Sequence, residues 1–250
     1  MTKTQKIKVS AVSYLNTLPF IYGINNSDVI NDIDLSLDIP SDCAIKLKNG
    51  EVDLGLVPVA ILPELKEYHI ISDYCIGADG KVDSVALFSD VPLDEIENVY
   101  LDYQSKTSVA LVQLLAKKLW KITPKWINAT EGFENKITGN TAGVIIGDRT
   151  FNLSKTYPYK YDLAEEWFNY TGLPFVFACW VSNKELPETF IKNFNSSLKN
   201  GVNNIDKVIF NHNEDNLSKE TLHRYLTQNI SYLLDDNKRK AIEAFLKSVE

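Results

Sequence analysis

The chain begins with alternating apolar and polar residues, and this pattern returns along its first third. The alternating runs, each of which predicts a β-strand, are residues 6–13, 33–39, 52–57 and 82–88. Helical patterns separate the first three runs. One begins at Asn16 and tolerates Pro19 in its first turn. The other is short, with Ser41 as its expected N-cap and its end at Asn49 and Gly50.

The rest of the chain continues the alternation and ends in helices. Further strands are predicted over residues 98–103, 124–128, 142–147 and 175–181. A polar loop, residues 104–108, opens a helix that continues through Trp120. After the last strand, helices are predicted over residues 187–200, 218–233 and 236–249. This order of strands and helices is typical of an α/β fold.

The pattern predicts two α/β domains rather than one. We expect the first domain to contain residues 1–90 and 180–250, and the second to contain residues 94–175. The chain would then cross between them near residues 89–95 and again near residues 174–181. Two crossings form a hinge, and the cleft between the domains is the expected ligand site.

Composition supports globular domains and excludes several functions. The chain has 250 residues, 44% of them hydrophobic, and a net charge of −7, which argues against non-specific binding to nucleic acid or to a membrane surface. We see no signal-peptide pattern and no apolar run long enough to span a bilayer, so a cytoplasmic protein is expected. Its three cysteines, Cys43, Cys75 and Cys179, are far apart, which favours buried free thiols and predicts neither disulfides nor a metal site.

Several short segments narrow the class of protein. Residues 49–58, NGEVDLGLVP, are similar to a segment of type II periplasmic-binding-protein folds. The other informative patterns are YLN…P in residues 12–20, LD…S.TS in 101–108, IGD in 146–148 and DL…EW in 162–167. Together and in this order they resemble the chorismate dehydratases, a family of menaquinone biosynthesis enzymes. The resemblance implies a two-domain periplasmic-binding-protein-like (type II) fold with the ligand cleft between the domains.

A sister family of the same pathway, the 1,4-dihydroxy-6-naphthoate synthases, is the alternative. Its members begin with an SPCPNDT type of motif and depend on a histidine for catalysis. Here the corresponding residues 13–17 read SYLNT, and the histidines, His69, His212 and His223, lie near no motif. This departure favours the dehydratases.

The resemblance implies a substrate and a reaction. Chorismate, a small dicarboxylate, would lose one water and become 3-[(1-carboxyvinyl)oxy]benzoate, which makes the protein a carbon–oxygen lyase without a cofactor. The proton that is lost lies on a carbon conjugated with the ring carboxylate, so the developing charge is delocalised. Because the motif residues include no strong base, we expect the substrate's own enolpyruvyl carboxylate to accept this proton.

The matching motifs also assign residues. Asn16 and Ser84 are the expected catalytic residues, because an amide and a hydroxyl can hydrogen-bond the leaving group. The residues expected to bind substrate are Ser13, Tyr14, Ser105, Thr107, Ser108 and Asp148. Helix N-termini near Asn16 and Ser105 would offer backbone N–H groups, one to each carboxylate.

Plainer structural roles remain open for these residues. Instead of binding substrate, Ser105 or Thr107 can simply be an N-cap. Likewise Ser84 can be an ordinary strand hydroxyl, and Asp148 can be a helix cap. Arg149 is most simply interpreted as a solvated loop charge.

Two other classes of protein share this fold. A non-catalytic solute-binding protein for a small carboxylate would have the same cleft, but the absence of a leader pattern argues against it. An effector domain of a transcription regulator would follow a helix-turn-helix, and we see none before residue 6.

Overall fold

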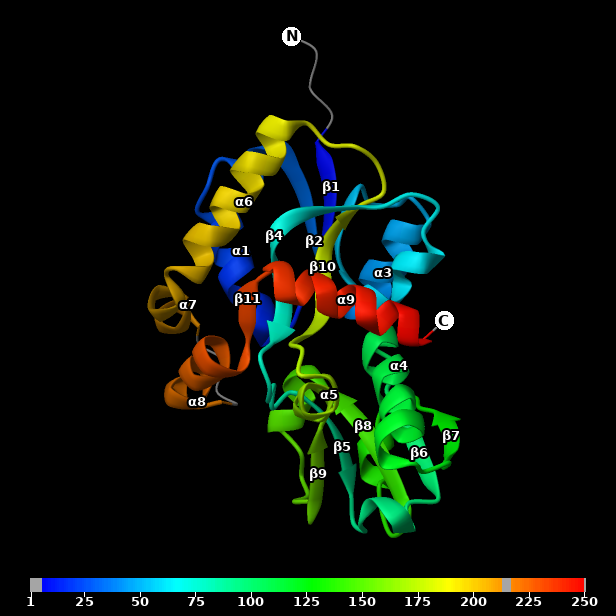
Figure 1. The fold of residues 1–250 in the computed structure, drawn as a ribbon. Helices are drawn as coiled ribbons and strands as arrows, with labels where there is room; N and C mark the ends of the chain where they lie inside the picture. Colours follow the sequence, from blue (N-terminus) through cyan, green and yellow to red (C-terminus); the bar gives the residue numbers. More distant parts are fainter. Residues whose placement is uncertain (1–5, 213–216, 250) are drawn as a thin grey trace.

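The chain folds into two β-sheets with flanking helices, and the sheets lie one above the other in Figure 1. The computed structural model describes residues 6–212 and 217–249. The first sheet has six strands in the order β11-β4-β10-β3-β1-β2. Their bounds are β1 Ile7–Val12, β2 Ile33–Asp38, β3 Leu54–Pro58, β4 His69–Ala78, β10 Phe175–Ser182 and β11 Ser231–Leu233.

The second sheet has five strands in the order β7-β6-β8-β5-β9. Their bounds are β5 Val85–Ser89, β6 Asn98–Leu101, β7 Lys125–Asn128, β8 Thr141–Ile146 and β9 Tyr159–Asp162. Each sheet mixes parallel and antiparallel pairs: β1 runs parallel to β2 and β3, whereas β10 is antiparallel to β3 and β4. In the second sheet β6 runs parallel to β7 and β8, and β5 is antiparallel to β8 and β9.

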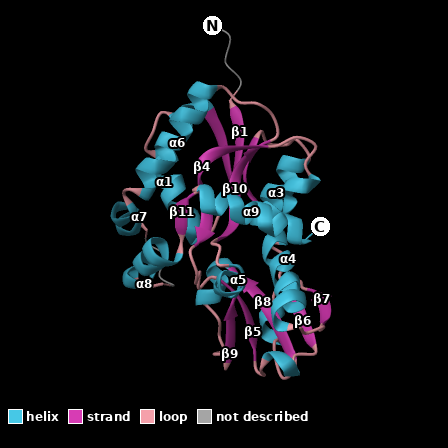
Figure 2. Ribbon diagram, in the orientation of Figure 1, coloured by secondary structure: helices cyan, strands magenta, loops and turns pink. Residues whose placement is uncertain are grey.

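Helices flank both sheets (Figure 2). Their bounds are α1 Leu18–Asn25, α2 Val29–Asp32, α3 Pro40–Lys48, α4 Lys106–Leu115, α5 Leu163–Thr171, α6 Glu188–Val202, α7 Ile205–Asn211, α8 Lys219–Arg224 and α9 Asp236–Val249. We call the six-stranded sheet with its helices the first lobe. The second lobe is the five-stranded sheet with α4 and α5. The C-terminal helix α9 lies against the first lobe and contacts α4 of the second (Figure 1).

All eight predicted strands are present, but β4 and β9 were not predicted, and two other predictions are wrong in part. The strand expected in the first domain over residues 82–88 is β5, and it pairs with β8 and β9 of the second sheet. The first crossing therefore lies between β4 and β5, before residue 85, and not near residues 89–95. The predicted helix over residues 218–233 ends early, because a π-helical turn at Tyr225–Asn229 leads into β11, which pairs with β4.

The N-cap of α3 also differs from the prediction. Ile39 is the N-cap and Pro40 occupies the first helical position, so Ser41 lies inside the helix. Proline is well suited to this position because it has no N–H to leave unpaired and its φ is already helical. The predicted end of this helix is confirmed, since Asn49 is its C-cap and Gly50 follows with φ of 71°.

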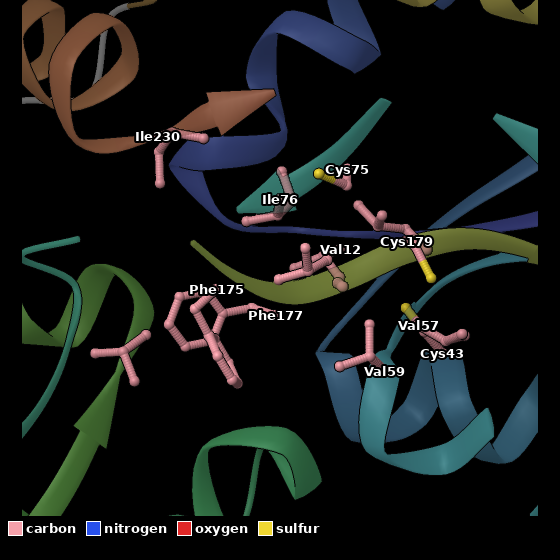
Figure 3. Close-up of a cluster of buried hydrophobic side chains, with 14 of the residues drawn as sticks. Val12, Cys43, Val57, Val59, Cys75, Ile76, Phe175, Phe177, Cys179 and Ile230 are labelled. Carbon is pink, nitrogen blue, oxygen red and sulfur yellow. The ribbon is translucent and has the colours of Figure 1, made fainter. Parts of the chain in front are cut away.

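The core of the first lobe is built from the faces of β1, β3, β4 and β10 (Figure 3). Every residue of β3 and β10 is buried, as expected for central strands covered on both sides. The predicted free, buried state of the cysteines is confirmed for Cys43, Cys75 and Cys179. Burial raises the pKa of the Cys43 and Cys179 thiols to about 12, so they act as small apolar side chains.

Candidate active site

A pocket lies between the two lobes, where the ends of strands from both sheets meet. It has about 450 Å³ of empty space, counted out to its open mouth. The polar residues that line it are Tyr14, Asn16, Ser84, Ser105 and Ser108. Apolar walls come from Val12, Ile76 and Phe177 of the first sheet and from Val85 and Ile146 of the second. Figure 3 shows Val12, Ile76 and Phe177 close together, on β1, β4 and β10. Five of the eight predicted site residues therefore share one pocket.

The two predicted catalytic residues meet through a third residue that the sequence did not indicate. The Asn16 side-chain amide donates a hydrogen bond to the hydroxyl of Tyr225, with 3.3 Å between Nδ2 and Oη. The Tyr225 hydroxyl in turn donates to Ser84 Oγ at 2.8 Å. Asn16, Ser84 and Tyr225 are all buried. The three side chains form one hydrogen-bonded chain between the lobes.

Ser84 is positioned by the loop that precedes β5. Asp83 adopts a left-handed conformation with φ of 64°, which is uncommon for a residue other than glycine. The buried carboxylate of Asp162 accepts hydrogen bonds from the backbone N–H groups of Val82 and Asp83. The same carboxylate caps the start of α5 by accepting from the amide of Ala164. Asp162 thus fixes the turn that delivers Ser84 to the pocket.

The start of α4 supplies the second group of hydroxyls. Ser105 is the N-cap of this helix, and its Oγ accepts from the Ser108 backbone N–H at 3.2 Å. The Ser105 hydroxyl also donates to Ser108 Oγ at 3.1 Å. Ser105 therefore caps the helix and also lines the pocket, and its contact with substrate stays a prediction. The positive end of the helix dipole faces the pocket, which favours an anionic ligand group there.

Thr107 lies outside the pocket wall. It is fully buried, and its Oγ1 accepts a hydrogen bond from the backbone N–H of Ala60, 3.2 Å away, in the 3-10 segment that follows β3. Thr107 belongs to the second lobe and Ala60 to the first. The Thr107 hydroxyl thus joins the lobes and does not line the pocket.

Tyr14 reaches from the first lobe across the pocket to the second. Its hydroxyl donates to the Gln104 side-chain oxygen. Its ring packs on Gly147, where a Cβ would lie only 2.6 Å from a ring carbon and where φ is 65°. Burial raises the pKa of the Tyr14 hydroxyl, and the nearby Arg149 opposes that shift. Ser13, in contrast, is exposed, does not line the pocket and donates its backbone N–H to the Asp38 carbonyl oxygen.

Asp148 forms another contact between the lobes. Its carboxylate accepts the backbone N–H of Leu15, which begins the 3-10 turn Leu15–Thr17 of the first lobe. Negative charge is favourable at such a position because the first amides of a helical turn have no partners within it. Asp148 lies in a neighbouring surface hollow and is not part of the pocket wall.

Arg149 is an ion-paired residue of the second lobe, and its interpretation as a solvated loop charge is wrong. Its guanidinium pairs with the buried carboxylate of Asp102 and, at 2.6 Å, with Glu134. Burial raises the pKa of Asp102, and the Arg149 guanidinium opposes this shift. Asp102 also accepts the backbone N–H groups of Gln104 and Ile146. This cluster holds the loop before α4 against the end of β8, beside the pocket.

Two classes of feature are absent from residues 6–212 and 217–249. This part of the chain holds no group of three or more His, Cys, Asp or Glu side chains arranged to bind a metal ion. None of its helices is long and apolar enough to cross a membrane.

The decisive comparison is with a sequence profile for menaquinone biosynthesis proteins, which matches residues 7–250. The chain belongs to the menaquinone biosynthesis family. One relative, the chorismate dehydratase of Thermus thermophilus, is 26% identical over 235 residues, which cover 84% of each chain.

Solved structures show the fold of this family member. A protein of Archaeoglobus fulgidus matches with a TM-score of 0.74 at 12% identity and covers 97% of this chain and 96% of its own. A Candida albicans protein described as having the generic periplasmic binding protein fold matches with a TM-score of 0.66 at 14% identity, over 98% of this chain and 90% of its own. The alkanesulfonate-binding protein of Xanthomonas axonopodis matches with a TM-score of 0.62 at 11% identity, covering 98% and 91%. The predicted periplasmic-binding-protein-like fold is confirmed.

Proposed function

We propose that the protein is a chorismate dehydratase, which removes water from chorismate to give 3-[(1-carboxyvinyl)oxy]benzoate. The observation that carries this proposal is the relative of that name, which aligns with 84% of this chain. The family match over residues 7–250 supports a step in menaquinone biosynthesis. The pocket between the lobes supports the chemistry.

The pocket suits a small ring that bears anionic groups. Apolar side chains such as Phe177 and Ile76 supply walls for the ring, and the start of α4 with Ser105 and Ser108 supplies donors for a carboxylate. The net charge of −7 gives no general attraction for a dianion. The affinity therefore comes from these local donors and from the dipole of α4.

Elimination requires help for the departing hydroxyl. Asn16 and Ser84 both line the pocket and are joined through the Tyr225 hydroxyl. In the proposed reaction they hydrogen-bond the ring hydroxyl as its carbon–oxygen bond breaks. Aromatisation of the ring supplies the driving force, and the two residues supply orientation in a buried site.

The base in this proposal is part of the substrate. Tyr14 is the one titratable residue among the described residues that line the pocket, and burial raises its pKa, so it is neutral near pH 7. The enolpyruvyl carboxylate of chorismate then accepts the neighbouring ring proton. The ring carbon–hydrogen electron pair becomes part of the aromatic system, the hydroxyl leaves, and this proton leaves with it as water. The product keeps both carboxylates.

A turnover assay tests the proposed function. Purified protein is incubated with chorismate and no added cofactor, and the products are followed by ultraviolet absorbance and mass spectrometry. We expect an aromatic product lighter than chorismate by one water. A Ser84→Ala preparation, purified in parallel, controls for contaminating enzymes and should be slower by about tenfold or more. Binding of chorismate without conversion would contradict the proposal and favour a non-catalytic solute-binding protein.

A further inference from the structure

We propose that Tyr225 is a positioning residue of this site. Its hydroxyl fixes the direction of the hydrogen bonds made by Ser84 and Asn16, so that both residues present a donor hydrogen to the pocket. The pocket end formed by these residues is then selective for an oxygen that accepts hydrogen bonds. Its identity as the leaving hydroxyl of chorismate rests on the proposed function.

Tyr225 is held rigidly behind the pocket wall. It begins the π-helical turn Tyr225–Asn229, and its side chain is 1% exposed. The ring of Phe151 meets its ring edge to face, with 5.0 Å between the centroids. Such turns are rare and are often found at functional sites. The ring therefore has little freedom, and its hydroxyl stays between Ser84 Oγ and Asn16 Nδ2.

A count of protons gives the direction of each hydrogen bond. A tyrosine hydroxyl has one proton, and burial raises the pKa of Tyr225 above its ordinary value of 10.0, so the proton is retained. Because the Asn16 amide donates to the Tyr225 oxygen, the Tyr225 proton is directed to Ser84 Oγ. A buried hydroxyl proton without an acceptor is costly, which makes this direction the stable one.

The consequence is a pair of donors in the pocket. Ser84 Oγ already accepts from Tyr225, so its own proton is available to a ligand. The Asn16 amide nitrogen uses one hydrogen on Tyr225, so its second hydrogen is available to a ligand, while its side-chain oxygen accepts from the Thr17 hydroxyl. Both Ser84 and Asn16 line the pocket, whereas Tyr225 does not. Without the Tyr225 hydroxyl, Ser84 would be free to donate away from the ligand.

Two matched ligands test this inference without turnover. Benzoate and 4-hydroxybenzoate differ by one oxygen, placed opposite the carboxylate as the hydroxyl of chorismate is. We expect calorimetry to show that wild-type protein binds 4-hydroxybenzoate about tenfold more tightly than benzoate, because one good hydrogen bond in a buried site raises affinity by about that factor. In Tyr225→Phe the two affinities should become equal within about twofold, because the donor pair is no longer oriented.

Tyr232→Phe is the matched control. Tyr232 is a second buried tyrosine, and its hydroxyl donates to the backbone oxygen of Asn16 at 3.0 Å, apart from the side-chain network. This variant loses a buried hydrogen bond of similar kind but should keep the preference for 4-hydroxybenzoate. Equal affinity of wild-type protein for the two ligands, failure to bind either, or a preserved preference in Tyr225→Phe would overturn the inference.

Kinetics with chorismate separate positioning from a general structural role. Tyr225→Phe should lower kcat by about 10- to 100-fold and change KM by less than about threefold. Added to Ser84→Ala, it should lower kcat much less than it does alone, because Tyr225 acts largely through Ser84. Fully additive effects would overturn the inference. If wild-type protein leaves chorismate unchanged, the proposed function fails, and the preference between the two benzoates still decides the role of Tyr225.

Discussion

The carboxylate of Asp148 accepts the backbone N–H of Leu15, with oxygen–nitrogen distances of 3.2 and 3.1 Å. Asp148 follows β8 in the second lobe, and Leu15 follows β1 in the first. Together with the Thr107 hydroxyl on the Ala60 amide, this bond joins the lobes beside the pocket. The lobes are thus held together by the protein's own hydrogen bonds, to which a ligand adds.

The first prediction is that Asp148→Ala shifts the lobes towards an open form. Loss of a charged hydrogen bond costs about 1.5–3 kcal/mol, enough to change the ratio of closed to open forms by about tenfold or more. We expect a larger radius of gyration in small-angle scattering without ligand, and weaker binding of chorismate. Asp90→Ala is the control, because Asp90 bonds Gly139 and Lys155 within the second lobe. Identical scattering by wild-type protein and Asp148→Ala would show that this bond does not hold the lobes.

The second prediction concerns Asn16→Asp. The substitution keeps the size but places a carboxylate in a buried site that would bind a dianion. We expect kcat to fall by about 100-fold or more and affinity for chorismate to fall as well. Burial raises the pKa of the new carboxylate, so affinity should partly recover as the pH is lowered and the charge is lost.

An exposed asparagine provides the control for Asn16→Asp. Asn140→Asp adds the same charge at an exposed position of the second lobe and should leave the kinetics close to those of wild type. Wild-type kinetics in Asn16→Asp would remove Asn16 from the site.

The third prediction separates a contact from backbone strain. Gly147 and Gly172 both have positive φ, at 65° and 70°. A Cβ at Gly147 would lie 2.6 Å from the Tyr14 ring, whereas a Cβ at Gly172 would have nothing within 4 Å. Alanine at either position should destabilise the fold by about 1 kcal/mol or more through strain. Only Gly147→Ala should also displace Tyr14 and weaken binding of chorismate, which calorimetry can measure; equal affinities in the two variants would contradict this.

The fourth prediction concerns alkaline pH. Burial raises the pKa of Tyr225 and Tyr232 above their ordinary value of 10.0. Their neutral forms stabilise the fold fully below pH 10, and this stabilisation is lost as the pH rises further, because the unfolded chain releases protons that the folded chain retains. The free energy of unfolding should then fall by about 1.4 kcal/mol per pH unit for each tyrosine. Urea unfolding of wild type and of Tyr225→Phe across this range should give a shallower slope in the variant, and equal slopes would contradict the account.

Local patterns predicted most strands but not how they pair. The alternation in residues 82–88 predicts a strand, yet its partners, β8 and β9, lie more than fifty residues further along the chain. The local sequence does not indicate which of the two sheets contains this strand. The strand β11 was missed for the same reason: residues 231–233 pair with β4, and that distant contact overrides a helical pattern.

Candidate site residues could be predicted where motifs identified them, but their partners could not. The sequence pattern predicts that a tyrosine on an apolar helical face, such as Tyr225, is a core residue. Only the fold brings it to Ser84, which is 141 residues away. Arg149 likewise finds Asp102 across 47 residues. Thr107 was expected to contact substrate, but the structure places its hydroxyl on the Ala60 amide.

The proposed dehydration of chorismate can be measured in a single turnover. Wild-type protein is mixed in excess with chorismate and no cofactor, stopped at intervals, and every chorismate-derived species is measured by mass spectrometry. We expect chorismate to disappear and one aromatic species, lighter by one water, to take its place. If protein that calorimetry shows to have bound chorismate returns it intact, the protein is not a dehydratase.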